Sequence, residues 1–170
     1  MTTTTVVLMG VAGSGKSTVM AALAERLGWA TADGDDFHSP ENVARMRAGV
    51  PLTDEDRKPW LEALAAWIGE CEARSGAGEN AIVTCSALRR AYRDRIRDGH
   101  PSVRFVHLVA AVPTLDLRLR ERQGHYMPPS LLASQIEILE PLGPGEPGAA
   151  VSADAPLPEV VDAILALLRA

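Results

Sequence analysis

A glycine-rich turn between a predicted strand and a predicted helix is the feature that most constrains the fold of this chain. The segment GVAGSGKS, residues 10–17, fits the pattern G-x-x-x-x-G-K-[ST] at every required position. An apolar run, residues 6–9, precedes it, and a helically periodic stretch follows up to Gly28. Glycines let backbone N–H groups wrap around phosphates, and the helix N-terminus adds partial positive charge. The segment therefore predicts a phosphate-binding loop, in which Lys16 reaches the β- and γ-phosphates and the Ser17 hydroxyl binds Mg²⁺.

Strands and helices alternate along the rest of the sequence. Short apolar runs predict strands at 29–33, 81–85 and 103–109, and Val151 is expected in a short last strand. Helical patterns are expected at 39–49, 53–71, 88–98, 113–122, 129–140 and 158–168. This alternation predicts a three-layer α/β sandwich with helices on both faces of a mostly parallel sheet. With 170 residues and no visible linker, we expect a single domain over 1–170.

Composition narrows the functional class. The chain carries 17 Lys and Arg against 22 Asp and Glu, a net charge of −5, and only 4% aromatic residues. An acidic chain with few stacking rings is not expected to bind nucleic acid. It has no apolar stretch near 18 residues and no signal-peptide pattern, so we expect no membrane partner and a cytoplasmic location. The two cysteines, Cys71 and Cys85, are expected to be reduced, with at least one buried.

Acidic residues follow the second predicted strand, in the run DGDDFH at 33–38. The carboxyl ends of parallel strands are where open α/β sheets bind ligands, so Asp33 and Asp35 are expected beside the phosphates. One carboxylate could hold a metal-bound water while the other takes a proton from an attacking hydroxyl; the alternative is a solvated turn. The third strand ends in Cys85-Ser86 without the usual acid, and the GTPase motifs N-K-x-D and D-x-x-G are absent. These features favour a small-molecule kinase over a motor or a GTPase.

Arginines form a further pattern. Arg89, Arg93 and Arg97 recur at four-residue spacing, as do Arg118 and Arg122. Like charges on one helix face suggest contacts with phosphate or carboxylate groups, although an exposed solvated arginine remains the alternative for each. His125 follows a predicted helix end and precedes Pro128-Pro129, a position suited to a moving lid or to a loop without function.

Five segments together resemble the P-loop gluconate kinases, which are related to nucleoside and shikimate kinases. The matching segments are GVAGSGKST at 10–18, DGDDFHSPENVARMRAGVPLTDEDRKPWL at 33–61, CSALRRAYRDRIR at 85–97, RLRERQGHYMP at 118–128 and LLASQIEILEPL at 131–142. They lie in order and cover about half the chain. The second is much more specific than the phosphate-binding loop. The resemblance implies a five-stranded parallel sheet, a helical lid at about 115–140 and a homodimer.

The activity that the resemblance implies is ATP-dependent phosphorylation of D-gluconate at its 6-hydroxyl, giving 6-phosphogluconate and ADP. Lys16, Asp35, Arg118 and Arg122 would be catalytic, with Asp35 contacting the acceptor hydroxyl and Ser17 and Asp33 near Mg²⁺. The ATP phosphates would be held by Gly10, Val11, Ala12, Gly13, Ser14, Gly15, Lys16, Ser17 and Thr18. The sugar acid would be lined by Asp33, Asp35, His38, Arg57, Arg93, His125 and Gln135.

Two further expectations come from related families. By analogy with shikimate kinases, Arg57 is the expected clamp for the substrate carboxylate, because a planar guanidinium pairs well with a carboxylate. Residues 143–149 should approach the adenine, although they are richer in Pro and Gly than the family pattern. Three rival interpretations are an adenylylsulfate kinase, a shikimate kinase and a nucleotide-binding regulatory module without turnover. The sequence contains no Lys-Gly-Leu-Tyr element, which an adenylylsulfate kinase is expected to carry.

Overall fold

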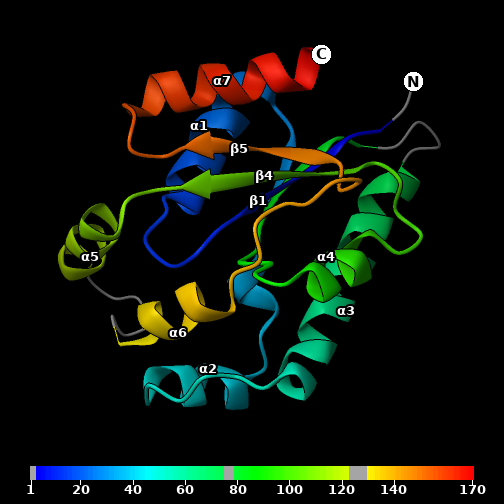
Figure 1. Cartoon of the computed structure of the whole chain (residues 1–170). Helices are drawn as coiled ribbons and strands as arrows, with labels where there is room; N and C mark the ends of the chain where they lie inside the picture. Colours follow the sequence, from blue (N-terminus) through cyan, green and yellow to red (C-terminus); the bar gives the residue numbers. More distant parts are fainter. Residues whose placement is uncertain (1–2, 75–78, 123–129) are drawn as a thin grey trace.

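Five parallel strands form one sheet in the order β2-β3-β1-β4-β5 (Figure 1). The computed structural model describes residues 3–74, 79–122 and 130–170. The strands are β1 (Thr5–Met9), β2 (Ala30–Asp33), β3 (Ala81–Thr84), β4 (Val103–Val109) and β5 (Gly148–Ser152). The helices are α1 (Lys16–Leu27), the 3₁₀ helix η1 (Gly34–Phe37), α2 (Pro40–Arg47), α3 (Asp54–Ala73), α4 (Arg90–Arg97), α5 (Val112–Glu121), α6 (Leu131–Ile138) and α7 (Leu157–Arg169).

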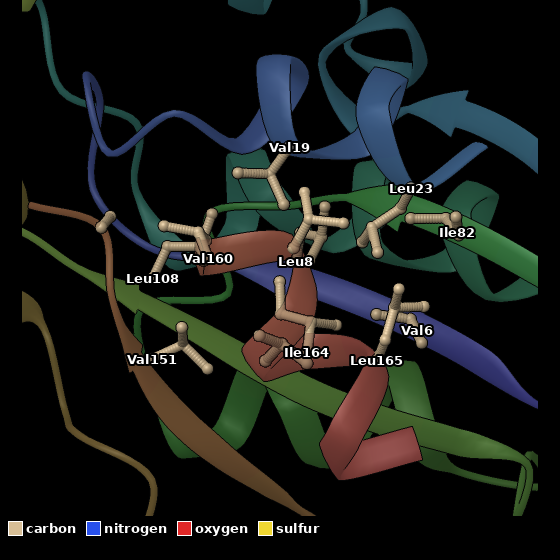
Figure 2. Close-up of a cluster of buried hydrophobic side chains, with 13 residues drawn as sticks. Val6, Leu8, Val19, Leu23, Ile82, Leu108, Val151, Val160, Ile164 and Leu165 are labelled. Carbon is tan, nitrogen blue, oxygen red and sulfur yellow. The ribbon is translucent and has the colours of Figure 1, made fainter. Parts of the chain in front are cut away.

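The central strand β1 is buried on both faces. Alternate side chains of a strand point to opposite sides, so Val6 and Leu8 enter one core while Val7 and Met9 enter the other. In the first core, α1 and α7 cover the sheet, and their apolar side chains meet those of the strands (Figures 1 and 2). In the second core, α3 and α4 cover the opposite face. The expected three-layer α/β architecture is confirmed.

β1 pairs with β3 on one side and with β4 on the other. The connection after β1 leads to β2 on one side of the sheet, whereas the connection after the neighbouring β3 leads to β4 on the other side, so the strand order switches between β1 and β3. In open parallel sheets, such a switch point opens a crevice at the carboxyl ends of the strands. The loop after β1, the η1 helix after β2 and the turn after β3 all begin at this edge. Helices α2, α5 and α6 lie at the same end of the sheet (Figure 1). The fold therefore gathers the segments that carry the sequence motifs.

Most element boundaries lie within two residues of their predicted positions. The largest difference is at β5, which begins at Gly148, three residues before Val151, the residue expected in the last strand. The Phe105 N–H donates to the Pro147 carbonyl (2.8 Å), so the ladder with β4 continues back to this proline. Among the described residues, no helix has the length and apolar character needed to cross a bilayer.

The end of β2 lies very close to the end of β3. A Cβ placed on Gly34 would lie 2.0 Å from the Thr84 carbonyl oxygen, and that backbone cannot move without displacing the strand. On the other side of the turn, the Trp60 indole N–H donates to the Gly34 carbonyl (2.7 Å). Gly34 thus allows the acidic turn after β2 to pack directly against β3 and α3.

We expect Gly34→Ala to lower the free energy of unfolding by about 3 kcal/mol, because the added methyl must separate two backbones. Gly28→Ala is the matched control: Gly28 has a φ of +67°, and no atom lies within 4 Å of the position its methyl would take, so only backbone strain of about 1 kcal/mol is expected. Urea unfolding of both variants measures the difference. Equal losses would contradict the close approach.

Candidate functional site

The glycine-rich loop after β1 has the conformation that phosphate binding requires. Gly13 and Gly15 have φ values of +82° and +94°, in the left-handed region that side chains disfavour. Helix α1 begins at Lys16, so its N-terminus faces the loop. The Lys16 ammonium donates to the carbonyls of Gly10 (2.9 Å) and Val11 (3.0 Å), and burial lowers the pKa of this lysine. Lys16 therefore lies folded over the loop.

The Asp33 carboxylate connects three elements at the carboxyl edge of the sheet. Its Oδ1 accepts hydrogen bonds from the Thr84 hydroxyl (2.9 Å) and the Asp35 N–H (3.0 Å), and its Oδ2 accepts one from the Ser17 hydroxyl (3.4 Å). The Gly34 N–H in turn donates to the Thr84 hydroxyl (3.1 Å). Hard oxygen donors such as Ser17 and Asp33 suit Mg²⁺, which takes few protein ligands and completes its shell with phosphates and water. The pair fits the predicted metal site.

His38 lies beside this carboxylate cluster. Its ring stacks on that of Trp60 with centroids 4.2 Å apart and planes 16° apart. Burial lowers the pKa of His38 to about 4, with the Arg57 charge adding to the effect and Asp35 opposing it. The imidazole is therefore neutral at pH 7. Its buried Nδ1 makes no hydrogen bond with any described residue.

Arg57 enters the site from the first turn of α3. Its Nη1 donates to the Leu52 carbonyl (2.5 Å) and the Tyr92 hydroxyl (3.3 Å), and it lies 3.9 Å from an Asp54 carboxylate oxygen. Within the described chain, neither Nε nor Nη2 makes a hydrogen bond. One edge of the planar guanidinium is thus anchored, while the other remains available for a carboxylate.

Two clefts meet at the glycine-rich loop. The first is lined by Ala12, Gly13, Gly15, Lys16, Ser17, Asp33, Asp35, His38, Met46, Leu52, Arg57, Trp60, Thr84, Ser86, Leu88, Arg122 and Gln135. The second is lined by Gly13, Ser14, Gly15, Ser17, Thr18, Val19, Arg118, Glu121, Arg122, Ala153, Ala155, Leu157 and Val160. Gly13, Gly15, Ser17 and Arg122 belong to both. A phosphate bound by this loop would therefore lie between two clefts, each of which could hold a different ligand.

Residues from α5 and α6 complete these clefts. Arg118 lies in the second cleft, where its guanidinium donates to the Ala153 carbonyl (2.7 Å) and, at 3.4 Å, to the Gly13 and Ser14 carbonyls. In the first cleft, the buried Gln135 amide oxygen accepts a hydrogen bond from the Ala12 N–H (2.7 Å). Gln135 thus ties α6 to the loop.

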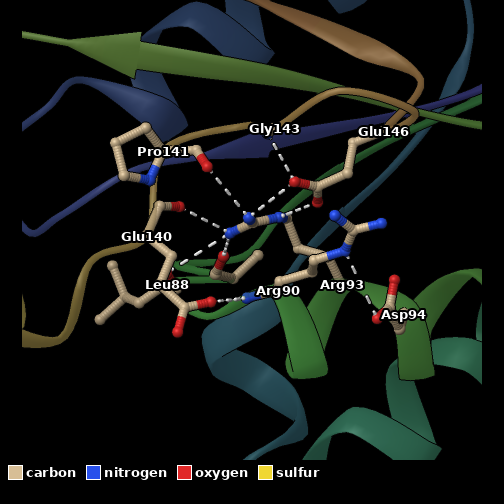
Figure 3. A network of polar contacts seen from close by, with 9 residues as sticks. Leu88, Arg90, Arg93, Asp94, Glu140, Pro141, Gly143 and Glu146 are labelled. Carbon is tan, nitrogen blue, oxygen red and sulfur yellow. Dashed lines mark hydrogen bonds and ion pairs between the residues drawn. The ribbon is translucent and has the colours of Figure 1, made fainter.

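Arg93, one of the predicted substrate residues, is not among the residues that line the first cleft. Its buried guanidinium pairs with Glu146, Nε to Oε1 at 2.5 Å and Nη2 to Oε2 at 3.0 Å, and the two side chains are 1% and 4% exposed. It also donates to the Ala87 (2.9 Å) and Glu140 (3.0 Å) carbonyls (Figure 3). Ala87 has a φ of +44°, so Arg93 holds a left-handed turn between β3 and α4. Arg93 therefore supports the cleft wall from behind.

Residues 143–149, which are expected to approach the adenine, pack against Arg93. Glu146 accepts the Gly143 N–H (2.7 Å) and the Arg93 guanidinium, contacts that lower the pKa of its carboxyl group. Glu146 therefore closes the Arg93 network. The residues after β5 that line the second cleft are Ala153, Ala155, Leu157 and Val160. The predicted substrate residue His125 lies outside the described residues.

The comparisons with known proteins decide the family. An AAA domain model matches residues 6–142. A gluconokinase of Gluconobacter oxydans is 47% identical over 148 residues, which are 87% of this chain and 82% of that protein.

The chain belongs to the gluconokinase family.

Solved structures agree with this assignment. A sugar kinase from Janibacter superposes with a TM-score of 0.91 at 47% identity, covering 99% of this chain and 95% of the other. A gluconokinase from Sinorhizobium meliloti gives a TM-score of 0.84 at 42% identity, covering 98% and 91%. The predicted family, the kinase class and the P-loop kinase fold are confirmed.

Sequence reasoning missed three residues that shape the first cleft. Thr84 holds Asp33, Trp60 stacks on His38, and Tyr92 contacts Arg57. Trp60 and Tyr92 lie inside the segments that resemble the family, which is the signal that could have singled them out. Thr84 immediately precedes such a segment, at the strand end where many P-loop proteins carry an acid.

We expect Arg93→Met to destabilise the protein by about 3–5 kcal/mol, because it leaves the buried Glu146 carboxylate without its partner. The matched control is Arg90→Ala on the same helix, where the 3.9 Å pair with Asp94 is exposed and a change below about 0.5 kcal/mol is expected. Urea unfolding measures both. A loss for Arg93→Met no larger than that of the control would refute its structural role.

Acid should destabilise the folded protein through His38. The pKa of His38 is about 4 in the folded protein and 6.5 ordinarily. Between these pH values the His38 imidazole is therefore protonated in the unfolded chain and neutral in the folded protein. Stability from this group is complete above about pH 7 and lost as the pH falls toward 4. Relative to His38→Gln, wild type should lose about 2 kcal/mol between pH 7 and pH 4.5. Parallel pH profiles in urea unfolding would show that His38 is not buried as a neutral ring.

Proposed function

We propose that this protein transfers the γ-phosphoryl group of ATP to the 6-hydroxyl of D-gluconate, giving 6-phosphogluconate and ADP. The observation that carries the proposal is that one cleft holds Lys16, Asp35 and the open edge of Arg57 together. These groups supply a phosphate contact, a hydroxyl contact and a carboxylate contact, which are what phosphorylation of a sugar acid needs. Membership of the gluconokinase family supports the same substrate.

ATP would occupy the second cleft, with its phosphates on the loop. The loop N–H groups and the α1 N-terminus would bind the phosphate oxygens. Arg118 would contact the nucleotide from α5. Arg122, which lines both clefts, would contact the transferred group, because a guanidinium there can follow negative charge as it moves.

D-gluconate would lie in the first cleft with its carboxylate on Arg57. Nε and Nη2 of the guanidinium form a fork that matches two carboxylate oxygens, a geometry that favours a planar anion over an uncharged sugar. His38, which is neutral and lines this cleft, would bind a hydroxyl of the sugar chain. Gln135 lines the same cleft and, by accepting the Ala12 N–H, would hold the glycine-rich loop in place beside the bound substrate.

The chemical step depends mainly on positioning. Asp35 would orient the 6-hydroxyl toward the γ-phosphate and accept its proton as the new bond forms. In a loose transition state the charge lies on the phosphoryl oxygens, so Lys16 and Arg122 would contribute most by stabilising that charge. Mg²⁺ held through Ser17 and Asp33 would neutralise charge on the β- and γ-phosphates when bound. The Asp33 carboxylate would also fix Asp35, because it accepts the Asp35 N–H.

Finer properties follow from the same family resemblance. The proposed lid, about 115–140, includes α5 and α6 on either side of residues 123–129. A homodimer and a cytoplasmic location are proposed with it. Analytical ultracentrifugation at micromolar protein concentration tests the homodimer.

Coupled ADP release with ATP and Mg²⁺ tests the function across a panel of D-gluconate, shikimate, adenylylsulfate, AMP and glucose. We expect acceptor-dependent turnover with gluconate and none with glucose, which lacks the carboxylate for Arg57. Asp35→Asn should lower kcat by at least about a hundredfold while ATP affinity, measured by calorimetry, stays within about twofold.

Each departure has a distinct meaning. Turnover with another acceptor would overturn the substrate while leaving a P-loop kinase. ATP hydrolysis independent of any acceptor would overturn the kinase proposal in favour of a nucleotide-binding module. Near wild-type turnover in Asp35→Asn would remove this carboxylate from the mechanism.

A further inference from the structure

Tyr92 lies directly behind the arginine of the first cleft. It projects from the first turn of α4 into the core between α3, α4 and the sheet, and it is 5% exposed. Its hydroxyl contacts two charged groups of α3, the Asp54 carboxylate and the Arg57 guanidinium, the latter at 3.3 Å from Nη1. A tyrosine hydroxyl thus joins the two helices at the point where Arg57 enters the cleft.

The direction of these hydrogen bonds is fixed by chemistry. An ionised carboxylate can only accept, and a guanidinium can only donate. The single hydroxyl hydrogen of Tyr92 therefore goes to Asp54, and its oxygen lone pair faces Arg57 Nη1. Burial, with the Asp54 contact next in size, raises the pKa of Tyr92, so the hydroxyl keeps its hydrogen at neutral pH. Phenylalanine in this place could make neither contact.

The same tyrosine also restricts the plane of the guanidinium. The Arg57 Cζ lies 5.4 Å from the centroid of the Tyr92 ring, within the range of a cation–π contact. With the Leu52 carbonyl as the third contact of Nη1, the anchored edge of Arg57 is held by α4, by the loop before α3 and by α3 itself. These contacts fix the orientation of the guanidinium, and with it the direction in which the opposite edge, Nε and Nη2, points.

We propose that Tyr92 is a positioning residue that fixes the Arg57 guanidinium so that its open edge meets the acceptor carboxylate. This inference rests on the proposed function, because it assigns the carboxylate end of the acceptor to Arg57. Tyr92 does not touch the acceptor and acts only through the arginine. Its removal should therefore weaken acceptor binding without affecting the nucleotide or the chemical step.

Tyr92→Phe keeps the ring, the packing and the cation–π contact and removes only the hydroxyl. We expect the KM for gluconate to rise about tenfold, the size of one hydrogen bond to a charged group, with kcat and the KM for ATP within about twofold of wild type. The control is Arg95→Ala, which breaks another α3–α4 contact, the exposed 3.6 Å pair with Glu62. That variant should leave all three constants within about twofold.

A double-mutant cycle separates positioning from general loosening of the core. In an Arg57→Ala background the hydroxyl has no guanidinium to hold, so adding Tyr92→Phe should change the gluconate KM by less than about twofold. A tenfold effect that persists in this background would overturn the inference, as would an unchanged KM in the single variant. If wild type phosphorylates no sugar acid at all, the proposed function fails and this inference fails with it. Additivity in an active enzyme refutes the inference alone.

Discussion

The carboxylate of Asp33 is the interaction on which the rest of the candidate site depends. Three donors converge on it, the hydroxyls of Ser17 and Thr84 and the N–H of Asp35, and they belong to α1, β3 and η1. A single half-buried carboxylate thereby sets the distance between the phosphate-binding loop and the acidic turn. Because polar groups withdrawn from water are costly when unpaired, all three elements are held to one arrangement. The close packing at Gly34 gives the same region its rigid backbone.

The wall opposite the phosphate-binding loop is built differently, from charged groups between helices. Arg57 belongs to α3 and Arg93 to α4. Arg57 opens into the cleft, whereas Arg93 is closed off by Glu146 and four backbone carbonyls. Burial of a guanidinium is tolerated only when its donors are satisfied, and the 140–146 segment satisfies them. The left-handed turn at Ala87 is kept in place by this network.

The sequence alone predicted the α/β class, the order of elements and the phosphate-binding loop, because periodicity and a local motif determine these. Its resemblance to a family supplied the family itself, together with the predictions of a lid and of the site residues. What it could not supply was the choice between chemically identical residues. Arg57 and Arg93 differ in role because Glu146 lies 53 positions from Arg93 and reaches it only in the folded chain. Thr84 was missed for a related reason: a threonine in an apolar strand has no local signal until Asp33 lies beside it.

The two clefts draw largely on different parts of the chain, and the described residues that they share are Gly13, Gly15, Ser17 and Arg122. Beyond the loop, the first is lined by the segments after β2 and β3, by α3 and by α6. The second is lined by α1, α5, the residues after β5 and α7. Substitutions that reshape one pocket therefore need not disturb the other. For evolution, this separation makes the scaffold modular: a lineage can change which small molecule receives the phosphoryl group while inheriting its nucleotide chemistry intact.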